Sequence, residues 1–367
     1  MKIFLAGRYN PGIIKSGPEK FSKRLYEFLL NNSDNKSNEI FFISFFFKEF
    51  TDGSLYNRLF GFSFISGENN IIKIGIFRLF GFLLKGKPDI IHISFSEIFT
   101  IFFYIYKIIF NYRIIVTVHS LAKIELKNAP RSIRIKKGLL ERFIFKNSNK
   151  LVFVSKLLLD EFKARYNYMI DDRYLIIPNG IDSNNKFNDK RNFLSKNINV
   201  VFYNGYNNII QRGFDFIIDN FKELKSIEIN LHIIGVNIHN FNYPGINIIN
   251  HNFLNNDDLA EFWRDKHFIV KSISFDSFPI MVIEAMASGV IPIISDNIGT
   301  RDYIKNGING FIYSKDDSKP LFRIMQIILN NEYNLDVVSR NASAIKDILN
   351  WDKVLHEYLA AYNLKQL

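Results

Sequence analysis

The sequence of residues 272–313 is SISFDSFPIMVIEAMASGVIPIISDNIGTRDYIKNGINGFIY. It places two carboxylates, Asp276 and Glu284, eight positions apart, the first in a loop and the second at the start of a predicted helix that Gly289 ends. A loop that runs into a helix start presents unpaired backbone N–H groups and the positive end of the helix dipole, which favour an anion such as a phosphate. Carboxylates on both sides of such a site indicate a ligand with hydroxyls as well as phosphates, namely a nucleotide-sugar.

Outside this stretch, short apolar runs alternate with segments of helical spacing. In the first half the expected strands are residues 2–6, 40–47, 89–94, 114–119 and 151–155. The pattern restarts after a short strand and turn at residues 176–182, with further expected strands at 199–205, 229–235, 268–272 and 291–295. Alternating strands and helices predict a parallel sheet covered on both faces. The fold class is therefore α/β, with two Rossmann-like domains that face each other across a ligand-binding cleft.

The same pattern sets the expected domain boundaries. We expect an N-terminal domain over residues 1–182 and a C-terminal domain over residues 183–348. The last segment, residues 349–367, contains an amphipathic helix with no strand after it, and we expect this helix to cross back onto the N-terminal domain. A chain of 367 residues has a length typical of two domains.

Composition limits the function classes. The chain has no cysteine, which excludes disulfides, thiolate nucleophiles and cysteine zinc sites. The apolar run near the N-terminus is too short for a signal peptide, and the longest apolar run, 98–110, contains Lys107 and is shorter than the roughly 20 residues that cross a bilayer. We therefore expect the protein to be cytoplasmic. Peripheral attachment to the inner face of a membrane is compatible with this location.

The positive charge is concentrated in one half of the chain. Residues 1–180 carry a net charge of +13 and the remainder −2. Residues 123–150 alone hold nine Lys or Arg and two Glu, with an apolar stripe. This segment is either a solvated helix packed on its domain or a basic amphipathic surface that docks on anionic lipid. Nucleic acid is not expected as a partner, because no recognition motif accompanies the charge.

Several catalytic motifs are missing. The chain has no G-x-G-x-x-G after its first strand, no Walker A sequence, no metal-ligand spacing among its histidines and no G-x-S-x-G elbow. Dehydrogenase, ATPase, metalloenzyme and serine hydrolase functions are disfavoured.

Three short motifs follow one another in the opening stretch: EAMASG at 284–289, GTRD at 299–302 and NGING at 306–310. Together with Asp276 they resemble, over about forty residues, the donor-binding signature of the retaining glycosyltransferases of family 4, which have the GT-B fold. Without this resemblance, Asp276 and Glu284 could be a solvated loop acid and an acid that complements a helix dipole.

The resemblance extends to other positions. Gly17 resembles the N-terminal glycine loop that approaches the donor phosphates, and His119 falls on the active-site histidine of the family. Gly205 and Arg212 resemble the family's phosphate clamp. The chain departs from the family in having Asp276 for the first glutamate and Tyr206 for an arginine, and Arg212 stands for a lysine, one residue further along the chain.

The resemblance implies a metal-independent hexosyltransferase with no cofactor, whose co-substrate is a nucleoside diphosphate sugar. Glu284 would bind the ribose hydroxyls, Asp276 would orient the transferred sugar, and His119 would hydrogen-bond the sugar or phosphate. Arg212 would bind the diphosphate. The loop residues that would line the donor site are Phe278, Pro279, Ile280 and Met281.

The acceptor is harder to predict. A basic N-terminal domain rich in phenylalanine favours a lipid-linked glycan, as in the biosynthesis of lipopolysaccharide or capsule. Two alternatives stay open: a nucleotide-sugar epimerase of the same fold, and a non-catalytic module that binds nucleotide or lipid.

Overall fold

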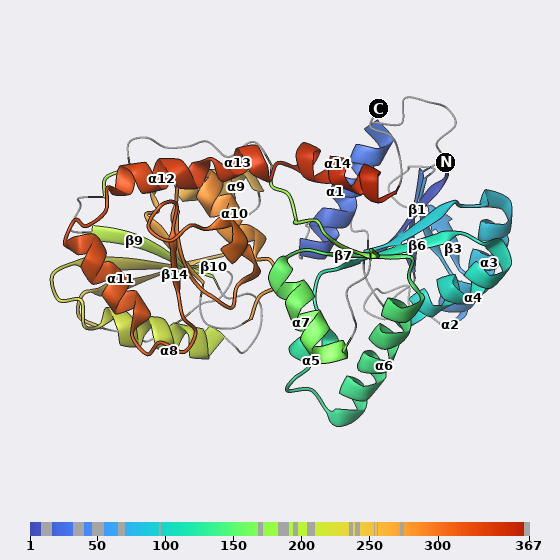
Figure 1. Cartoon of the computed structure of the whole chain (residues 1–367), viewed down its shortest axis with the longest axis horizontal. Coiled ribbons are helices and arrows are strands. Elements are labelled where there is room, and N and C mark those ends of the chain that lie inside the picture. Colours follow the sequence, from blue (N-terminus) through green and yellow to red (C-terminus); the bar gives the residue numbers. More distant parts are fainter. Residues whose placement is uncertain are drawn as a thin grey trace. The chain divides into compact units, whose positions relative to one another are not determined.

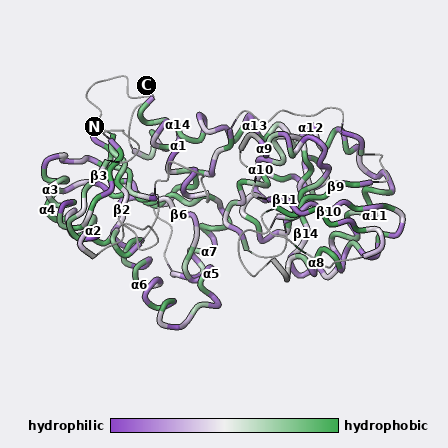
Figure 2. Tube along the Cα trace, turned by 180° about the vertical axis from the view of Figure 1, so that it is seen from behind, coloured by the Kyte–Doolittle hydropathy of each residue, from purple (hydrophilic) through white to green (hydrophobic). Residues whose placement is uncertain are grey.

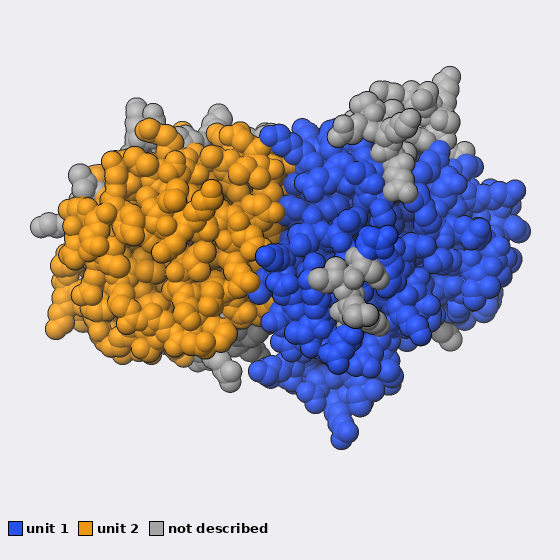
Figure 3. Space-filling model, in the orientation of Figure 1, with its two compact units in different colours: residues 1–179, 352–367 blue, residues 180–351 orange. Residues whose placement is uncertain are grey.

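The computed structural model describes residues 1–8, 17–31, 40–45, 55–64, 70–94, 97–167, 172–182, 191–193, 197–203, 210–234, 238, 243–252, 254, 256–271 and 275–362. The chain forms two compact units, which Figure 3 distinguishes by colour. Unit 1 comprises residues 1–179 and 352–367, and unit 2 comprises residues 180–351. The first boundary between the units, after residue 179, thus lies three residues before residue 182, the expected end of the N-terminal domain.

Unit 1 is built on an eight-stranded sheet with the order β3-β4-β2-β1-β5-β6-β7-β8, parallel except for β3 against β4 (Figure 1). Its strands are β1 (Ile3–Ala6), β2 (Ile40–Phe45), β3 (Phe62–Phe64), β4 (Ile71–Ile74), β5 (Ile90–Ile93), β6 (Arg113–Val118), β7 (Lys150–Phe153) and β8 (Tyr174–Ile176). Its α-helices are α1 (Gly17–Asn31), α2 (Leu55–Phe60), α3 (Ile76–Gly86), α4 (Ile101–Phe110), α5 (Ala122–Glu125), α6 (Arg131–Asn147), α7 (Lys156–Tyr166) and, from its second residue on, α14 (Trp351–Ala361).

Unit 2 has a six-stranded, fully parallel sheet with the order β11-β10-β9-β12-β13-β14. Its strands are β9 (Asn197–Phe202), β10 (Glu228–Ile234), β11 (Ile246–His251), β12 (Phe268–Lys271), β13 (Ile291–Ser295) and β14 (Phe311–Tyr313). Its α-helices are α8 (Ile210–Phe221), α9 (Asn256–Phe262), α10 (Ile280–Ala287), α11 (Pro320–Leu329), α12 (Leu335–Ser343) and α13 (Ile345–Ile348), and 3₁₀ turns lie at Trp263–Asp265 and Gly299–Tyr303.

The central strands are almost entirely apolar because helices cover both faces of each sheet. β1, β5 and β13 are buried at every position, as parallel strands between two helical layers should be. Figure 2 colours the trace by hydropathy and shows hydrophobic residues along strands of both sheets. The predicted α/β class with two Rossmann-like parallel sheets is confirmed. No helix in the described ranges is long and apolar enough to cross a membrane.

A buried polar network attaches the C-terminal helix α14 to unit 1. His92, in β5, is fully buried, and its Nδ1 bonds to the hydroxyl of Tyr362 while its Nε2 lies 2.8 Å from the hydroxyl of Thr117 in β6. The Thr117 hydroxyl in turn lies 3.2 Å from the hydroxyl of Tyr358 in α14. Burial, with a smaller contribution from nearby His119, lowers the pKa of His92 to about 3. A neutral imidazole therefore joins the helix to two central strands.

Candidate donor-binding site

The helix that carries Glu284 begins earlier than the sequence predicts. α10 starts at Ile280 with Pro279 at its N-cap, so Glu284 lies in the second turn and not at the helix start. The amide of Val282 donates to the carbonyl of Pro279 at 3.1 Å and closes the first turn. The amides of Ile280 and Met281 point out of the helix start without an intrahelical acceptor. The first turn of α10, from Ile280 on, is therefore the part of the helix that favours an anion. Glu284 lies one turn further along.

Glu284 is buried, and its helix is held firmly at the other end. Glu284 is 9% exposed. α10 ends at Ala287, and Gly289 adopts a φ of 83°, a left-handed conformation that glycine adopts without strain. Arg191 donates to the carbonyls of Ser288 at 2.9 Å and of Gly289 at 2.8 Å.

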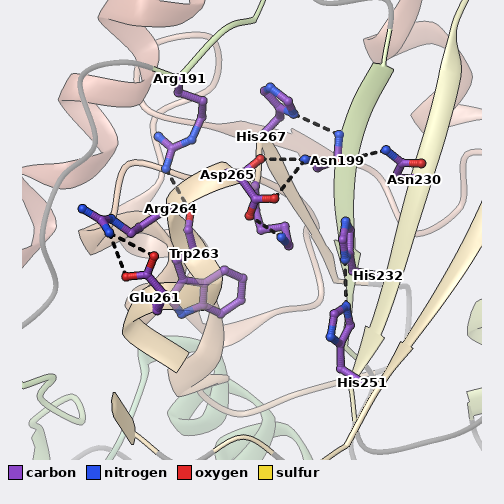
Figure 4. Close-up of polar contacts among 11 residues, drawn as sticks. Arg191, Asn199, Asn230, His232, His251, Glu261, Trp263, Arg264, Asp265 and His267 are labelled. Atoms are coloured by element: carbon purple, nitrogen blue, oxygen red, sulfur yellow. Dashed lines mark hydrogen bonds and ion pairs between the residues drawn. The ribbon is translucent and has the colours of Figure 1, made fainter. Parts of the chain in front are cut away.

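Arg191 also joins the end of α10 to the 3₁₀ turn at Trp263–Asp265 and to helix α12. Its guanidinium donates to the carbonyl of Trp263 at 3.1 Å, as Figure 4 shows, and to the hydroxyl of Ser339 at 3.1 Å. Burial lowers the pKa of Arg191 to about 10, so the guanidinium stays charged at neutral pH. Arg191 thus fixes the position of the helix that carries Glu284.

The separate motifs of the signature meet in unit 2. The amide of Gly299 donates to the carbonyl of Asp276 at 2.8 Å, so the GTRD turn pairs with the loop before α10. The rings of Phe278 and Tyr303 lie edge to face, with centroids 6.0 Å apart. The side-chain amide of Asn309, in the NGING turn, donates to the carbonyl of Tyr303 at 3.0 Å. The GTRD and NGING motifs therefore support the loop that leads into α10, and α10 carries the start of the EAMASG motif.

The side chain of Asp276 is held on both of its oxygens. Oδ1 accepts a hydrogen bond from the amide of Phe278 at 3.2 Å, and Oδ2 lies 3.0 Å from the ammonium of Lys271. The Asp276 side chain is 29% exposed, whereas that of Lys271 is 4% exposed. An ion pair with one buried partner fixes the carboxylate far more firmly than a surface pair would.

Lys271 is the residue of this site that the sequence analysis missed. It is the last residue of β12, whose other residues are phenylalanine, isoleucine and valine. Its ammonium lies 5.4 Å from the centre of the Tyr203 ring, which follows the neighbouring strand β9. A lysine at the carboxyl end of an otherwise apolar central strand is the signal that could have identified it, because ligands bind at that edge of a parallel sheet.

Two predicted donor-binding residues cannot be placed. Gly205 lies outside the described residues. Arg212 lies on α8, but its side chain falls outside the described part of the structure. Their assignment to the phosphate clamp stays a prediction.

In unit 1, His119 packs against helix α1. His119 follows β6 directly and is half-buried, and its ring lies edge to face against Phe21 of α1 with centroids 5.1 Å apart. Burial lowers the pKa of His119 to about 3, so the imidazole is neutral at physiological pH. Gly17 is the first residue of α1, four positions before Phe21. These two predicted residues lie in unit 1, whereas Asp276, Glu284 and the residues 278–281 lie in unit 2.

Other histidines belong to structural contacts. His267 accepts at Nδ1 from the amide of Asn199 at 2.9 Å (Figure 4). Its Nε2 therefore carries the proton and donates to the carbonyl of Asn192 at 3.0 Å. His232 and His251 form a pair across two strands at 2.8 Å. Among the residues that the structure describes, no three His, Asp or Glu side chains are grouped so that they could hold a metal ion.

Comparison with known families matches both halves of the chain. The family described as Glycosyltransferase Family 4 matches residues 47–185, and the family described as Glycosyl transferases group 1 matches residues 184–344. An uncharacterized glycosyltransferase of Methanocaldococcus jannaschii is 25% identical over 254 residues, which cover 65% of each chain. The match thus covers slightly less than two thirds of that relative.

Solved structures share the fold over nearly the whole chain. The Anabaena protein HepE, in complex with UDP and glucose, has a TM-score of 0.71 at 12% identity, covering 99% of both chains. The lipopolysaccharide outer core galactosyltransferase WaaB, in its apo form, has a TM-score of 0.68 at 15% identity, covering 99% of this chain and 100% of that one.

Proposed function

Because the chain belongs to family 4 of the glycosyltransferases, we propose that it transfers a hexose from a nucleoside diphosphate sugar to a hydroxyl of a glycan, with retention at the anomeric carbon. The observation that carries this proposal is the assembly of the three signature motifs around the first turn of α10, with a buried carboxylate one turn further on. The positive end of a helix favours a diphosphate, and a buried carboxylate can accept hydrogen bonds from ribose hydroxyls.

We assign the donor to unit 2. The amides of Ile280 and Met281 would bind the diphosphate at the start of α10, and Glu284 would accept hydrogen bonds from the ribose hydroxyls. Arg212 and Gly205 would complete the phosphate clamp. Asp276 would bind hydroxyls of the transferred sugar. Fixed cations and helix amides would stabilise the leaving diphosphate, so the proposed reaction needs no metal.

We assign to unit 1 the groups that act on the transferred sugar from the other domain. A neutral His119 would donate or accept a hydrogen bond with the sugar or phosphate, and Gly17 would let the backbone approach the phosphates. The predicted cleft between the two domains stays a prediction.

The proposed reaction takes place on one face of the sugar. The acceptor oxygen forms the new bond to the anomeric carbon as the bond to the diphosphate breaks, and the departing phosphate oxygen takes the acceptor proton. Excluding water during this step would suppress hydrolysis of the donor.

For the acceptor, we propose a lipid-linked glycan reached from the cytoplasmic face of an anionic membrane. The support comes from an exposed surface of unit 1 that we call the α2–α6 surface. Its exposed apolar side chains are Tyr56 and Phe60 on α2, Phe77, Phe80 and Leu84 on α3, Ile105, Ile108 and Ile109 on α4, and Ile133, Ile135, Leu139 and Phe143 on α6. Most of the large exposed apolar side chains in the described ranges belong to it.

The α2–α6 surface is continuous and basic. Neighbouring helices touch through aromatic rings: Phe60 stacks on Phe77 with centroids 5.1 Å apart, and Tyr104 contacts Phe143 at 5.3 Å. Helices α2, α3 and α4 contain no acidic residue, and α6 contains one, Glu141, which accepts a hydrogen bond from the amide of Ala122. The exposed cations of this surface are Arg78, Lys85, Arg131, Arg134, Lys136, Lys137, Arg142 and Lys146. Apolar side chains among cations, with almost no acid, suit an anionic lipid interface.

A transfer assay tests the proposed function. The purified protein would be incubated with radiolabelled hexose conjugates of UDP, GDP and ADP and with a lipid-linked glycan fraction, and the label would be followed into lipid. Label that enters the lipid only in the presence of acceptor supports transfer. Conversion of the sugar nucleotide without acceptor would instead indicate an epimerase. A protein that binds these nucleotides but transfers nothing would be a binding module.

A further inference from the structure

Lys271 is a buried cation in a strand whose packing is otherwise apolar. It is 3% exposed, although it ends a strand whose other positions are apolar. Burying an ammonium is costly unless an anion and hydrogen-bond acceptors surround it. Among the residues that the structure describes, Asp276 is the acid that pairs with it, at 3.0 Å. The carbonyl of Lys271 accepts from the hydroxyl of Tyr313 at 3.1 Å, which fixes the backbone beneath this pair.

The pair sets the plane of the Asp276 carboxylate. One oxygen contacts Lys271 and the other accepts from the amide of Phe278 at 3.2 Å. A carboxylate offers about four lone-pair positions, so two contacts leave others available. Because the Asp276 side chain remains 29% exposed, these positions can accept hydrogen bonds from a ligand.

We propose that Lys271 is a positioning residue for the transferred sugar: it holds the carboxylate of Asp276 in the orientation that binds sugar hydroxyls. This inference rests on the proposed function. Asp276 is one methylene shorter than the glutamate of the resembling signature, so its reach depends on where it is held. The centre of the Tyr203 ring lies 5.4 Å from the ammonium, so an aromatic ring is a second neighbour of this charge.

The competing role for Lys271 is direct contact with the diphosphate, and the two roles predict different losses. If Lys271 acts through Asp276, its replacement should affect only ligands that carry a sugar. If Lys271 binds phosphate directly, its replacement should weaken binding of the bare nucleoside diphosphate to the same extent. The experiment therefore compares UDP, GDP and ADP with their hexose conjugates by calorimetry, and measures kcat and KM for the conjugate that binds.

The variants are Lys271→Met, Lys271→Arg, Asp276→Asn and the double variant Lys271→Met/Asp276→Asn. Lys271→Met should leave affinity for the bare diphosphate within about twofold and lower kcat roughly ten- to a hundred-fold, because small misplacements near the reacting centre cost that much. Lys271→Arg should recover most of the loss. The double variant should lose no more than Asp276→Asn alone, since both act on one group. Thermal unfolding of each variant checks that it is folded.

Equal weakening of bare and sugar-bearing nucleotides by Lys271→Met would overturn the inference, and so would additive losses in the double variant. Both results leave the proposed function intact. If the wild-type protein binds no member of the panel, the proposed function itself fails and this inference fails with it.

Discussion

The guanidinium of Arg191 donates a hydrogen bond of 2.8 Å to the carbonyl of Gly289, the glycine that follows the helix carrying Glu284. Arg191 is 6% exposed and donates further to Ser288, Trp263 and Ser339. The position of Glu284, which we propose binds the ribose, thus depends on an arginine whose contact lies 98 positions further along the chain.

Replacing Arg191 with methionine should destabilise unit 2. Several buried carbonyls would lose their donor, which should lower the free energy of unfolding by roughly 2–5 kcal/mol. Urea denaturation measures this. Arg264→Met is the matched control, because Arg264 pairs with Glu261 at 2.9 Å on the surface and should contribute about 1 kcal/mol or less. Similar losses for both variants would contradict the anchoring role of Arg191.

His119→Asn should lower turnover more than it weakens nucleotide binding. If His119 hydrogen-bonds the sugar or phosphate as charge develops, its loss should reduce kcat roughly a hundred-fold, as removal of one such donor does elsewhere. Affinity for the nucleoside diphosphate should hardly change. His356→Asn, an exposed histidine on α14, is the control. Equal losses of turnover and binding would argue against this role.

The buried His92 should make unit 1 sensitive to acid. Its folded pKa of about 3 lies below the unfolded value near 6.5, so between these values the unfolded chain binds the extra proton. The stability from His92 is therefore present above pH 6.5 and is lost as pH falls toward 3, at about 1.4 kcal/mol per pH unit at most. Urea unfolding of wild type and His92→Gln at pH 7 and pH 5 measures this slope. An unchanged slope in the variant would show that His92 is not the group responsible.

The α2–α6 surface should bind anionic vesicles. In a flotation assay, the protein should bind phosphatidylcholine vesicles that contain phosphatidylglycerol and not vesicles of phosphatidylcholine alone. Lys136→Glu/Lys137→Glu should weaken binding about tenfold or more, since each cation near such a surface is worth about 1 kcal/mol. Ile108→Glu/Ile109→Glu should also weaken it, because both side chains are exposed at 87% and 61%.

The matched control for the vesicle assay is Val337→Glu/Ile348→Glu, which changes two exposed apolar side chains of unit 2. This variant should bind as the wild type does. Binding that does not depend on anionic lipid, or that the unit 2 variant weakens as much as the α4 variant, would remove the support for membrane attachment.

Most of the central strands of both sheets could be predicted from the sequence, because parallel strands buried on both faces leave continuous apolar runs. The start of α10 was predicted wrongly. Ile280, Val282 and Ile283 are β-branched and have little intrinsic helix preference, but burial of this segment within unit 2 overrides it. The strands β3, β4, β11 and β14 were not predicted. β3 and β14 are only three residues long, β4 is four residues long, and β11 is buried at only one of its six positions.

In the candidate site, the carboxylates could be found because their motif is local in sequence. Lys271 is recognisable in the sequence only as an unusual lysine at the end of an apolar strand, and its pairing with Asp276 could not be predicted. Arg191 could not be found, because what defines it is a set of tertiary contacts. The Lys271 ammonium contacts Asp276, and the Arg191 guanidinium contacts carbonyls and a hydroxyl of residues far along the chain. No periodicity or spacing encodes such pairs.

The most direct test of the central claim, that this chain binds and uses a nucleoside diphosphate sugar, is calorimetric titration of UDP, GDP and ADP into wild type and Glu284→Gln. We predict that wild type binds at least one of them and that Glu284→Gln binds it about tenfold or more weakly, because hydrogen bonds from ribose hydroxyls to a charged acceptor are lost. The variant should unfold at the same temperature as wild type. Binding of none of these nucleotides by wild type, or equal binding by a folded Glu284→Gln, would contradict the account.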